Sequence, residues 1–159
     1  MSSSANPQPK SEYPWSKKYP VDIDWDMDVP VSNMVKMLEE SVQKNGARTA
    51  LNFMGKKMTF KELDEASDKF AKSLQDQGIG KGNHVGLCLP NTPFYVIAYY
   101  GAMKAGATVV NFNPLYAEKE MADLINDSKT DMMVTFNNKQ LQAKLDKLTP
   151  PTDRLARLE

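Results

Sequence analysis

Apolar residues along the chain recur first every three to four positions and then every second position, and this alternation predicts successive helices and strands. A first helix is expected from Ser32, which can cap its start, to Gly46, which can end it. Its apolar face consists of Met34, Val35, Leu38 and Val42. A hairpin should follow, in which the strands TALNF and KKMTF are joined through Met54 and Gly55.

A second helix is expected within TFKELDEASDKFAKSLQDQGIGKG. Thr59 and Glu62 form a capping box, because each side chain can satisfy the other residue's free backbone amide. Gly78 stands where a C-terminal cap belongs. The predicted inward stripe of this helix consists of Leu63, Ala66, Phe70 and Leu74.

The following part of the chain alternates strand-like and helix-like stretches. HVGLCL, ATVVNF and DMMVTF have the pattern of strands, whereas PFYVIAYYGAMKAG, EKEMADLINDSK and NKQLQAKLDKL have the pattern of helices. Pro150 and Pro151 stop the last helix, and the inward residues of the middle one are Met121, Leu124 and Ile125. Strands and helices that alternate through short loops predict an α/β fold with three layers, in which helices cover both faces of a mostly parallel sheet.

The N-terminal residues have a different character, since they hold five of the ten prolines and both tryptophans. We expect a disordered leader up to about residue 12 and an extended arm from residue 13 to 30 that packs on the protein's own body. Peripheral contact of this arm with a membrane is the alternative, although its lysines are few for a polybasic anchor. Its stretch DIDWDMDV has the spacing of a calcium loop, but Met27 and Asn33 replace the required glycine and glutamate. The stretch therefore predicts an extended segment with one solvent-exposed face.

Three regions follow from these patterns. Residues 1–30 form the leader and arm, residues 31–149 form the α/β subdomain, and residues 150–159 form a polar tail. The tail PPTDRLARLE is expected to stop short of a further strand, because proline and charged residues dominate it.

Composition narrows the class of protein. The 159 residues suffice for one domain, and their 20 basic and 20 acidic side chains cancel, which argues against a nucleic-acid binder. A single cysteine excludes an intrachain disulfide. MSSSANPQPK lacks the apolar stretch of a signal peptide, and no apolar run approaches the roughly 20 residues that cross a bilayer. A cytoplasmic protein is expected.

Two groups of residues have the composition of known sites but not the required context. The glycines of GIGKGNHVG follow a helix and enter a strand, whereas a phosphate-binding loop follows a strand and opens a helix. We therefore predict a helix-to-strand turn. His84 and Cys88 share one face of a strand, but the chain has no second histidine or cysteine to complete a zinc site. Both are expected to be buried, and no metal ligand or catalytic residue is predicted.

Polar residues also stand just beyond the predicted strands. Asn91 and Thr92 lie where ligands bind in open α/β sheets and where helix caps also belong, and the capping role is favoured. In KAGATVVNFNPLY, Pro114 holds Asn113 extended and directs the chain into the next helix. Asn91, Asn113 and Pro114 are thus the candidates for the rim of a site. Helical spacing predicts packing roles for Tyr95, Tyr99 and Tyr100.

Three stretches together carry a family resemblance: MTFKELDEASDKFAKSLQDQGIGKGNHVGLCLPNTPFYVIAYYGAMKAG, KAGATVVNFNPLY and EKEMADLINDSKTDMMVTF. They resemble the N-terminal part of the adenylate-forming enzymes, and more narrowly that of bacterial long-chain fatty acid–CoA ligases. The arm YPWSKKYPVDIDWDMDVPV is similar to the leader of that subgroup. The resemblance runs from about Tyr13 to Asn137, with the stretches in the family's order and spacing.

The resemblance implies a two-step ligase. A fatty acid carboxylate attacks the α-phosphate of ATP with the help of magnesium, and the thiol of coenzyme A then displaces AMP. The family's phosphate loop, its ribose-binding aspartate and its C-terminal domain have no counterpart in these 159 residues, so no cofactor is assigned to this chain. The implied partner is the rest of the ligase or a complementary fragment.

Two alternatives stay open at this stage. The sequence does not say whether it is a shortened copy, one product of a split gene or an engineered piece. It also leaves open a free-standing, non-enzymatic α/β module that binds a nucleotide, a lipid or a partner chain.

Overall fold

The structure, a computed structural model, describes residues 14, 15, 18, 20, 30–148 and 155–158. The chain divides into two units, Met1–Ser32 and Asn33–Glu159, and the second contains every helix and strand discussed below. The predicted leader and most of the predicted arm, with Trp25 and its acidic stretch, lie outside the described residues.

The second unit begins with a helix and a hairpin. Helix α1 (Met34–Asn45) is capped by Asn33, whose Oδ1 accepts a hydrogen bond from the Lys36 amide at 2.9 Å. The prediction of Ser32 as the cap was wrong by one position, because the extended backbone that a cap requires falls at Asn33. Strands β1 (Thr49–Phe53) and β2 (Lys56–Thr59) pair antiparallel as predicted. Their turn places Met54 and Gly55 at positive φ angles of 50° and 83°.

Helix α2 (Phe60–Asp76) begins with the predicted capping box. The Glu62 amide donates to Thr59 Oγ1 at 3.2 Å, and Glu62 Oε2 accepts from the Thr59 amide at 2.7 Å. The helix ends as predicted, with Gly78 at a φ of 78°. Its buried residues differ from the predicted stripe at two positions, because Ser67 and Ala71 are buried where Ala66 and Phe70 were expected. Ser67 can be buried since its hydroxyl donates to the Asp64 carbonyl at 2.8 Å.

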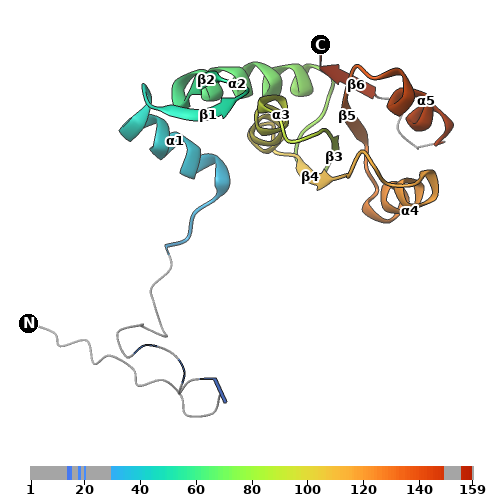
Figure 1. Cartoon of the computed structure of the whole chain (residues 1–159), viewed down its shortest axis with the longest axis horizontal. Coiled ribbons are helices and arrows are strands. Elements are labelled where there is room, and N and C mark those ends of the chain that lie inside the picture. The colour runs from blue at the N-terminus through green and yellow to red at the C-terminus, as the bar shows by residue number, and fades with distance from the viewer. Residues whose placement is uncertain (1–13, 16–17, 19, 21–29, 149–154, 159) are drawn as a thin grey trace, which may run out of the picture. The chain divides into compact units, whose positions relative to one another are not determined.

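The four strands β3 (His84–Cys88), β4 (Thr108–Asn111), β5 (Met132–Phe136) and β6 (Leu155–Leu158) form one parallel sheet. Their order is β4-β3-β5-β6, so β3 and β5 occupy the centre of the sheet (Figure 1). Because β3 is followed in sequence by β4 on one side and neighbours β5 on the other, the connections reverse direction between β3 and β5.

Strand β6 corrects the sequence prediction for the tail. Residues 150–159 were expected to lack a strand, but Leu155–Leu158 pair with β5 from Met133 to Phe136. The backbone groups on the free side of β5 need partners, and this requirement outweighs the polar composition of the tail. The prolines and charged residues of the tail conceal this strand in the sequence.

Helices α3 (Pro93–Lys104), α4 (Glu118–Ser128) and α5 (Lys139–Lys147) complete three layers, as predicted. The sheet separates two apolar cores. Val85 and Leu87 of β3 belong to the core under α2 and α3, whereas Cys88 belongs to the core under α4 and α5. The same alternation in β5 places Val134 in the first core and Met133 in the second.

The pair α2 and α3 is joined by an ion pair as well as by apolar packing. Lys104 Nζ lies 2.6 Å from Asp64 Oδ1 and 2.7 Å from Asp68 Oδ1. Burial by itself lowers the pKa of the Lys104 ammonium, but the hydrogen bonds to both carboxylates outweigh it and raise that pKa. Lys104 therefore stays charged between α2 and α3, and its two ion pairs hold the end of α3 against α2.

Candidate functional site at the carboxyl edge of the sheet

The glycine-rich segment and His84 have structural roles. The Gly80 amide donates to Asn83 Oδ1 at 3.0 Å within the predicted turn from α2 to β3. His84 Nδ1 contacts the carbonyl oxygen of Ser128, and the His84 amide donates to Asp131 Oδ2 at 2.8 Å. Among the described residues, no group of three histidine, cysteine, aspartate or glutamate side chains is arranged to hold a metal ion.

Cys88 is fully buried, as predicted. Burial raises the pKa of its thiol to about 11, although the nearby Lys144 ammonium partly opposes this. At pH 8 that pKa leaves about one thiol in a thousand as the reactive thiolate. We expect no labelling of the native chain by an aromatic disulfide reagent at pH 8, during the time in which the chain in urea reacts completely.

The sign of the pH effect gives a second check on Cys88. The folded pKa lies above that of an unfolded thiol, about 8.5. The folded state thus holds the thiol proton more tightly than the unfolded state does. The resulting stabilisation is complete below the unfolded pKa of about 8.5 and is lost as the pH rises toward about 11. Native labelling at the rate of an exposed thiol would contradict the burial.

A cavity within the described residues opens at the carboxyl ends of the parallel strands. Its volume is ≈ 680 Å³. Its walls come from residues 89–91 after β3, residues 111–116 at and after the end of β4, Tyr95 of α3 and Phe136 of β5. These segments meet because parallel strands end at the same edge, and the edge lies where the direction of the connections reverses.

Asn91, Asn113 and Pro114, the three rim residues proposed from sequence, all line this cavity. Asn113 Oδ1 accepts a hydrogen bond from the Leu115 amide at 3.0 Å, which fixes the bend after β4. This placement brings the three candidates together around one hollow. Their role in binding stays a prediction.

Tyr95 and Asn111 were not foreseen as part of the site. The Tyr95 hydroxyl donates to Asn111 Oδ1 at 3.0 Å, which joins the first turn of α3 to the end of β4. Burial, together with the neighbouring Tyr99, raises the pKa of the Tyr95 hydroxyl, so it stays protonated at neutral pH. Sequence spacing predicted a packing role for Tyr95, and its ring does stack on the ring of Tyr99, with 6.1 Å between the two ring centroids. The signal for its second role is its position in the first turn of the helix that follows strand β3.

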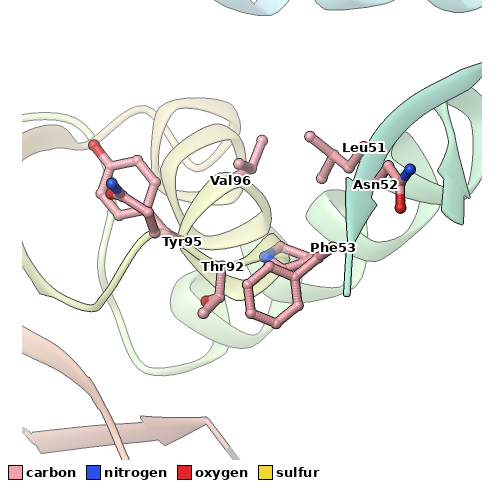
Figure 2. A pocket seen from close by; sticks show the side chains of 8 residues that line it. Leu51, Asn52, Phe53, Thr92, Tyr95 and Val96 are labelled. Carbon is pink, nitrogen blue, oxygen red and sulfur yellow. The ribbon is translucent and has the colours of Figure 1, made fainter. Parts of the chain in front are cut away.

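A second cavity of ≈ 310 Å³ lies between the hairpin and the start of α3. Figure 2 shows Leu51 and Val96 on opposite sides of this cavity, with the Phe53 ring beside Thr92. Thr92 occupies the N-cap position of α3, but its side chain makes no capping hydrogen bond. The favoured capping role was therefore wrong for the Thr92 side chain; the Tyr95 amide donates at 3.1 Å to the Thr92 backbone carbonyl oxygen instead.

Both cavities lack charge. Among the described residues that line them, aromatic, aliphatic, proline, asparagine and threonine side chains occur, and no lysine, arginine, aspartate or glutamate. Phosphate groups are usually bound by cationic side chains or by helix N-terminal amides near glycine-rich loops. The lining thus offers contacts to apolar groups and a few neutral hydrogen bonds.

The fold and the cavity place the chain in the class of open α/β proteins, in which the binding cavity lies beyond the carboxyl ends of the parallel strands. Residues 38–158 match the family described as AMP-binding enzyme. The chain therefore belongs to the AMP-binding enzyme family.

Relatives refine this assignment. A long-chain-fatty-acid–CoA ligase of Bacillus subtilis is 37% identical over 128 residues, which are 80% of this chain and 23% of that protein. An Escherichia coli protein described in the same words is 39% identical over 127 residues, or 78% of this chain and 22% of that protein. The chain thus spans less than a quarter of the length of these relatives.

Solved structures agree on the fold. The crystal structure of a long-chain-fatty-acid–CoA ligase from Archaeoglobus fulgidus has a TM-score of 0.75 and 26% identity, over 83% of this chain and 28% of that one. An anthranilate CoA ligase in complex with anthranoyl-AMP has a TM-score of 0.74 over 82% of this chain and 26% of that one. Its identity of 22% shows the fold alone. The chain is similar to the N-terminal part of adenylate-forming enzymes.

Proposed function

We propose that the chain is the N-terminal segment of an acyl-CoA synthetase that activates long-chain fatty acids. The complete enzyme would convert fatty acid, ATP and coenzyme A into acyl-CoA, AMP and diphosphate through an acyl-adenylate. The observation that carries this proposal is the identity of 37% and 39% to two bacterial long-chain-fatty-acid–CoA ligases over most of the chain.

The described residues do not fit magnesium or a triphosphate. Neither cavity at the carboxyl edge has a charged lining residue within the described ranges, and no described cluster has the ligands for a metal ion. ATP, magnesium and coenzyme A therefore belong, in this proposal, to the complete enzyme. The role of this segment is to present the carboxyl edge of its sheet to the remaining parts.

We propose that the complete enzyme acts in the cytoplasm, and its peripheral contact with the inner membrane stays a prediction. Within the ranges that the structure describes, no helix combines the length and the apolar character needed to cross a bilayer.

A chimera tests the function. The matched 128 residues of the Bacillus subtilis ligase would be replaced by the corresponding part of this chain. We expect acyl-CoA formation from hexadecanoate, ATP and coenzyme A by the chimera, and none by the 159-residue chain alone, because the described lining of neither cavity at the carboxyl edge offers the triphosphate a cation. Release of AMP, followed by chromatography, gives the readout.

The intact Bacillus subtilis ligase is the positive control for the assay. A chimera that folds, as judged by its thermal transition, but forms no acyl-CoA would contradict the assignment to long-chain ligases. Turnover by the isolated chain would contradict its dependence on the rest of the enzyme.

A further inference from the structure

The turn of the hairpin between β1 and β2 presents large apolar side chains to solvent. Met54 is 89% exposed, and Phe53, which precedes it, is 38% exposed. A methyl group added at Gly55 would meet no described atom within 4 Å, so open space surrounds that side of the turn. We call residues 53–57 the hairpin tip.

Met54 is an unusual residue for its position in this turn. Its φ of 50° lies in the left-handed region, where glycine, asparagine and aspartate are favoured and a bulky side chain is strained. Neither backbone preference nor solubility accounts for a methionine there. A large apolar side chain that is both exposed and held in a strained conformation indicates a contact with another surface.

The hairpin also carries an excess of positive charge. From Arg48 to Lys61 the chain has four basic and no acidic side chains, although the whole chain has 20 of each. Lys61 forms an ion pair with Glu65 at 3.9 Å. The ammonium groups at positions 56 and 57, in contrast, form no ion pair or hydrogen bond with any described residue. Two cations at the hairpin tip are therefore available to an anionic partner.

Lys56 and Lys57 border the apolar turn on both faces of the hairpin. Lys56 lies opposite Phe53 in the strand register, and consecutive residues of a strand point to opposite faces. The long lysine side chains can extend away from the turn while Met54 is buried. Such an arrangement suits the interface of a bilayer, where apolar groups reach the acyl boundary and lysines lie at the level of anionic headgroups.

We propose that the hairpin tip binds the surface of an anionic lipid bilayer. A protein partner is disfavoured by size, since a stable interface buries about 800 Å² on each partner and the hairpin tip offers two exposed large apolar side chains. Shallow insertion into a bilayer needs no larger area. The inference rests on the hairpin alone and goes beyond the proposed ligase function. It places membrane contact on described residues and not on the predicted arm, residues 13–30.

Co-sedimentation of the 159-residue chain with vesicles tests the charge requirement. Binding should be stronger to equal parts of phosphatidylglycerol and phosphatidylcholine than to phosphatidylcholine alone, and added salt should weaken it. Lys56→Gln with Lys57→Gln should weaken binding about fivefold for each lysine, the equivalent of ~1 kcal/mol. Lys81→Gln with Lys119→Gln is the control, because it removes the same charge from exposed lysines elsewhere. Equal losses in the two double variants would overturn the site.

Met54→Asn tests the apolar requirement without endangering the fold, because asparagine is favoured at this position of the turn. It should weaken vesicle binding roughly tenfold or more, since it removes the apolar side chain that inserts, and its thermal transition should not fall. Leu115→Asn is the matched control, because Leu115 is also 89% exposed but lies in the loop before α4. That control should change binding less than about twofold. Equal effects of the two variants would contradict insertion of the tip.

The remaining outcomes identify other occupants. No binding to either kind of vesicle would overturn the inference and assign the hairpin tip to a protein surface, such as the rest of the ligase. Vesicle binding that is unchanged in the hairpin variants would assign the contact to residues 1–30 and overturn it as well.

Vesicle binding and acyl-CoA formation are separate readouts of the chimera. An active chimera whose vesicle binding does not depend on Met54 would overturn the inference and leave the proposed function. A folded, inactive chimera whose binding does depend on Met54 would support the membrane contact and contradict the ligase assignment.

Discussion

Replacement of Leu87 by alanine is expected to lower the free energy of unfolding by about 2–5 kcal/mol. Leu87 has no exposed surface and lies in the central strand β3, where it pairs with Asn111 of β4 and Val134 of β5. Its side chain belongs to the core under α2 and α3, which is fixed from both sides by sheet and helices. The surroundings cannot collapse readily around a smaller residue, so the cavity term adds to the lost burial.

Urea denaturation followed by circular dichroism measures this loss. Leu115→Ala is the matched control, because it removes the same atoms from a side chain that is 89% exposed. That variant should stay within about 0.5 kcal/mol of the wild type. Similar losses in the two variants would show that the sheet does not form a specific core around Leu87.

The elements of the fold were predictable because their patterns are local. HVGLCL carries apolar residues on both faces, as a central parallel strand must, and Val85 and Cys88 indeed belong to opposite cores. The capping box of Thr59 and Glu62 depends on residues three apart, and it forms as expected. Such signals need no knowledge of the rest of the chain.

The sequence predictions were wrong where contacts between segments far apart in the chain determine the structure. Strand β6 forms because β5 offers unpaired backbone groups, which the sequence of the tail does not contain. Ser67 replaces Ala66 in the buried stripe because its hydroxyl finds the Asp64 carbonyl and because α3 approaches closely at that point. Neither condition is visible in the periodicity of α2 alone.

The candidate site divides in the same way. Asn91, Asn113 and Pro114 could be selected because residues after parallel strands meet at one edge. The bond from Tyr95 to Asn111 joins residues 16 apart and depends on the angle at which α3 leaves β3. The apolar hollow itself is a property of packing, so the order of residues could indicate its place but not its volume or its lack of charge.

Substitution of Gly101 by alanine should destabilise the chain by about 1–3 kcal/mol, the usual range for an overpacked core. A methyl group at this position of α3 would lie 2.7 Å from Phe70 Cδ1 and 3.0 Å from the Ser67 carbonyl oxygen. The phenyl ring can rotate, but the carbonyl belongs to the backbone of α2, so the two helices would have to move apart. This separation would also disturb the bonds of Lys104 to Asp64 and Asp68.

The expected loss of stability at Gly101 is informative because helix propensity alone would make the alanine variant more stable. Alanine stabilises an exposed helix by up to ~1 kcal/mol relative to glycine. The control is Gly80→Ala, whose added methyl would meet only the Ala105 carbonyl oxygen at 3.5 Å, an ordinary contact. Denaturant unfolding should show a clear loss for Gly101→Ala and a change within about 0.5 kcal/mol for Gly80→Ala. A stabilised Gly101→Ala variant would mean that α2 and α3 can move apart without loss of stability. Their close contact would then not fix the position of α3, and with it Tyr95, beside the cavity at the carboxyl edge of the sheet.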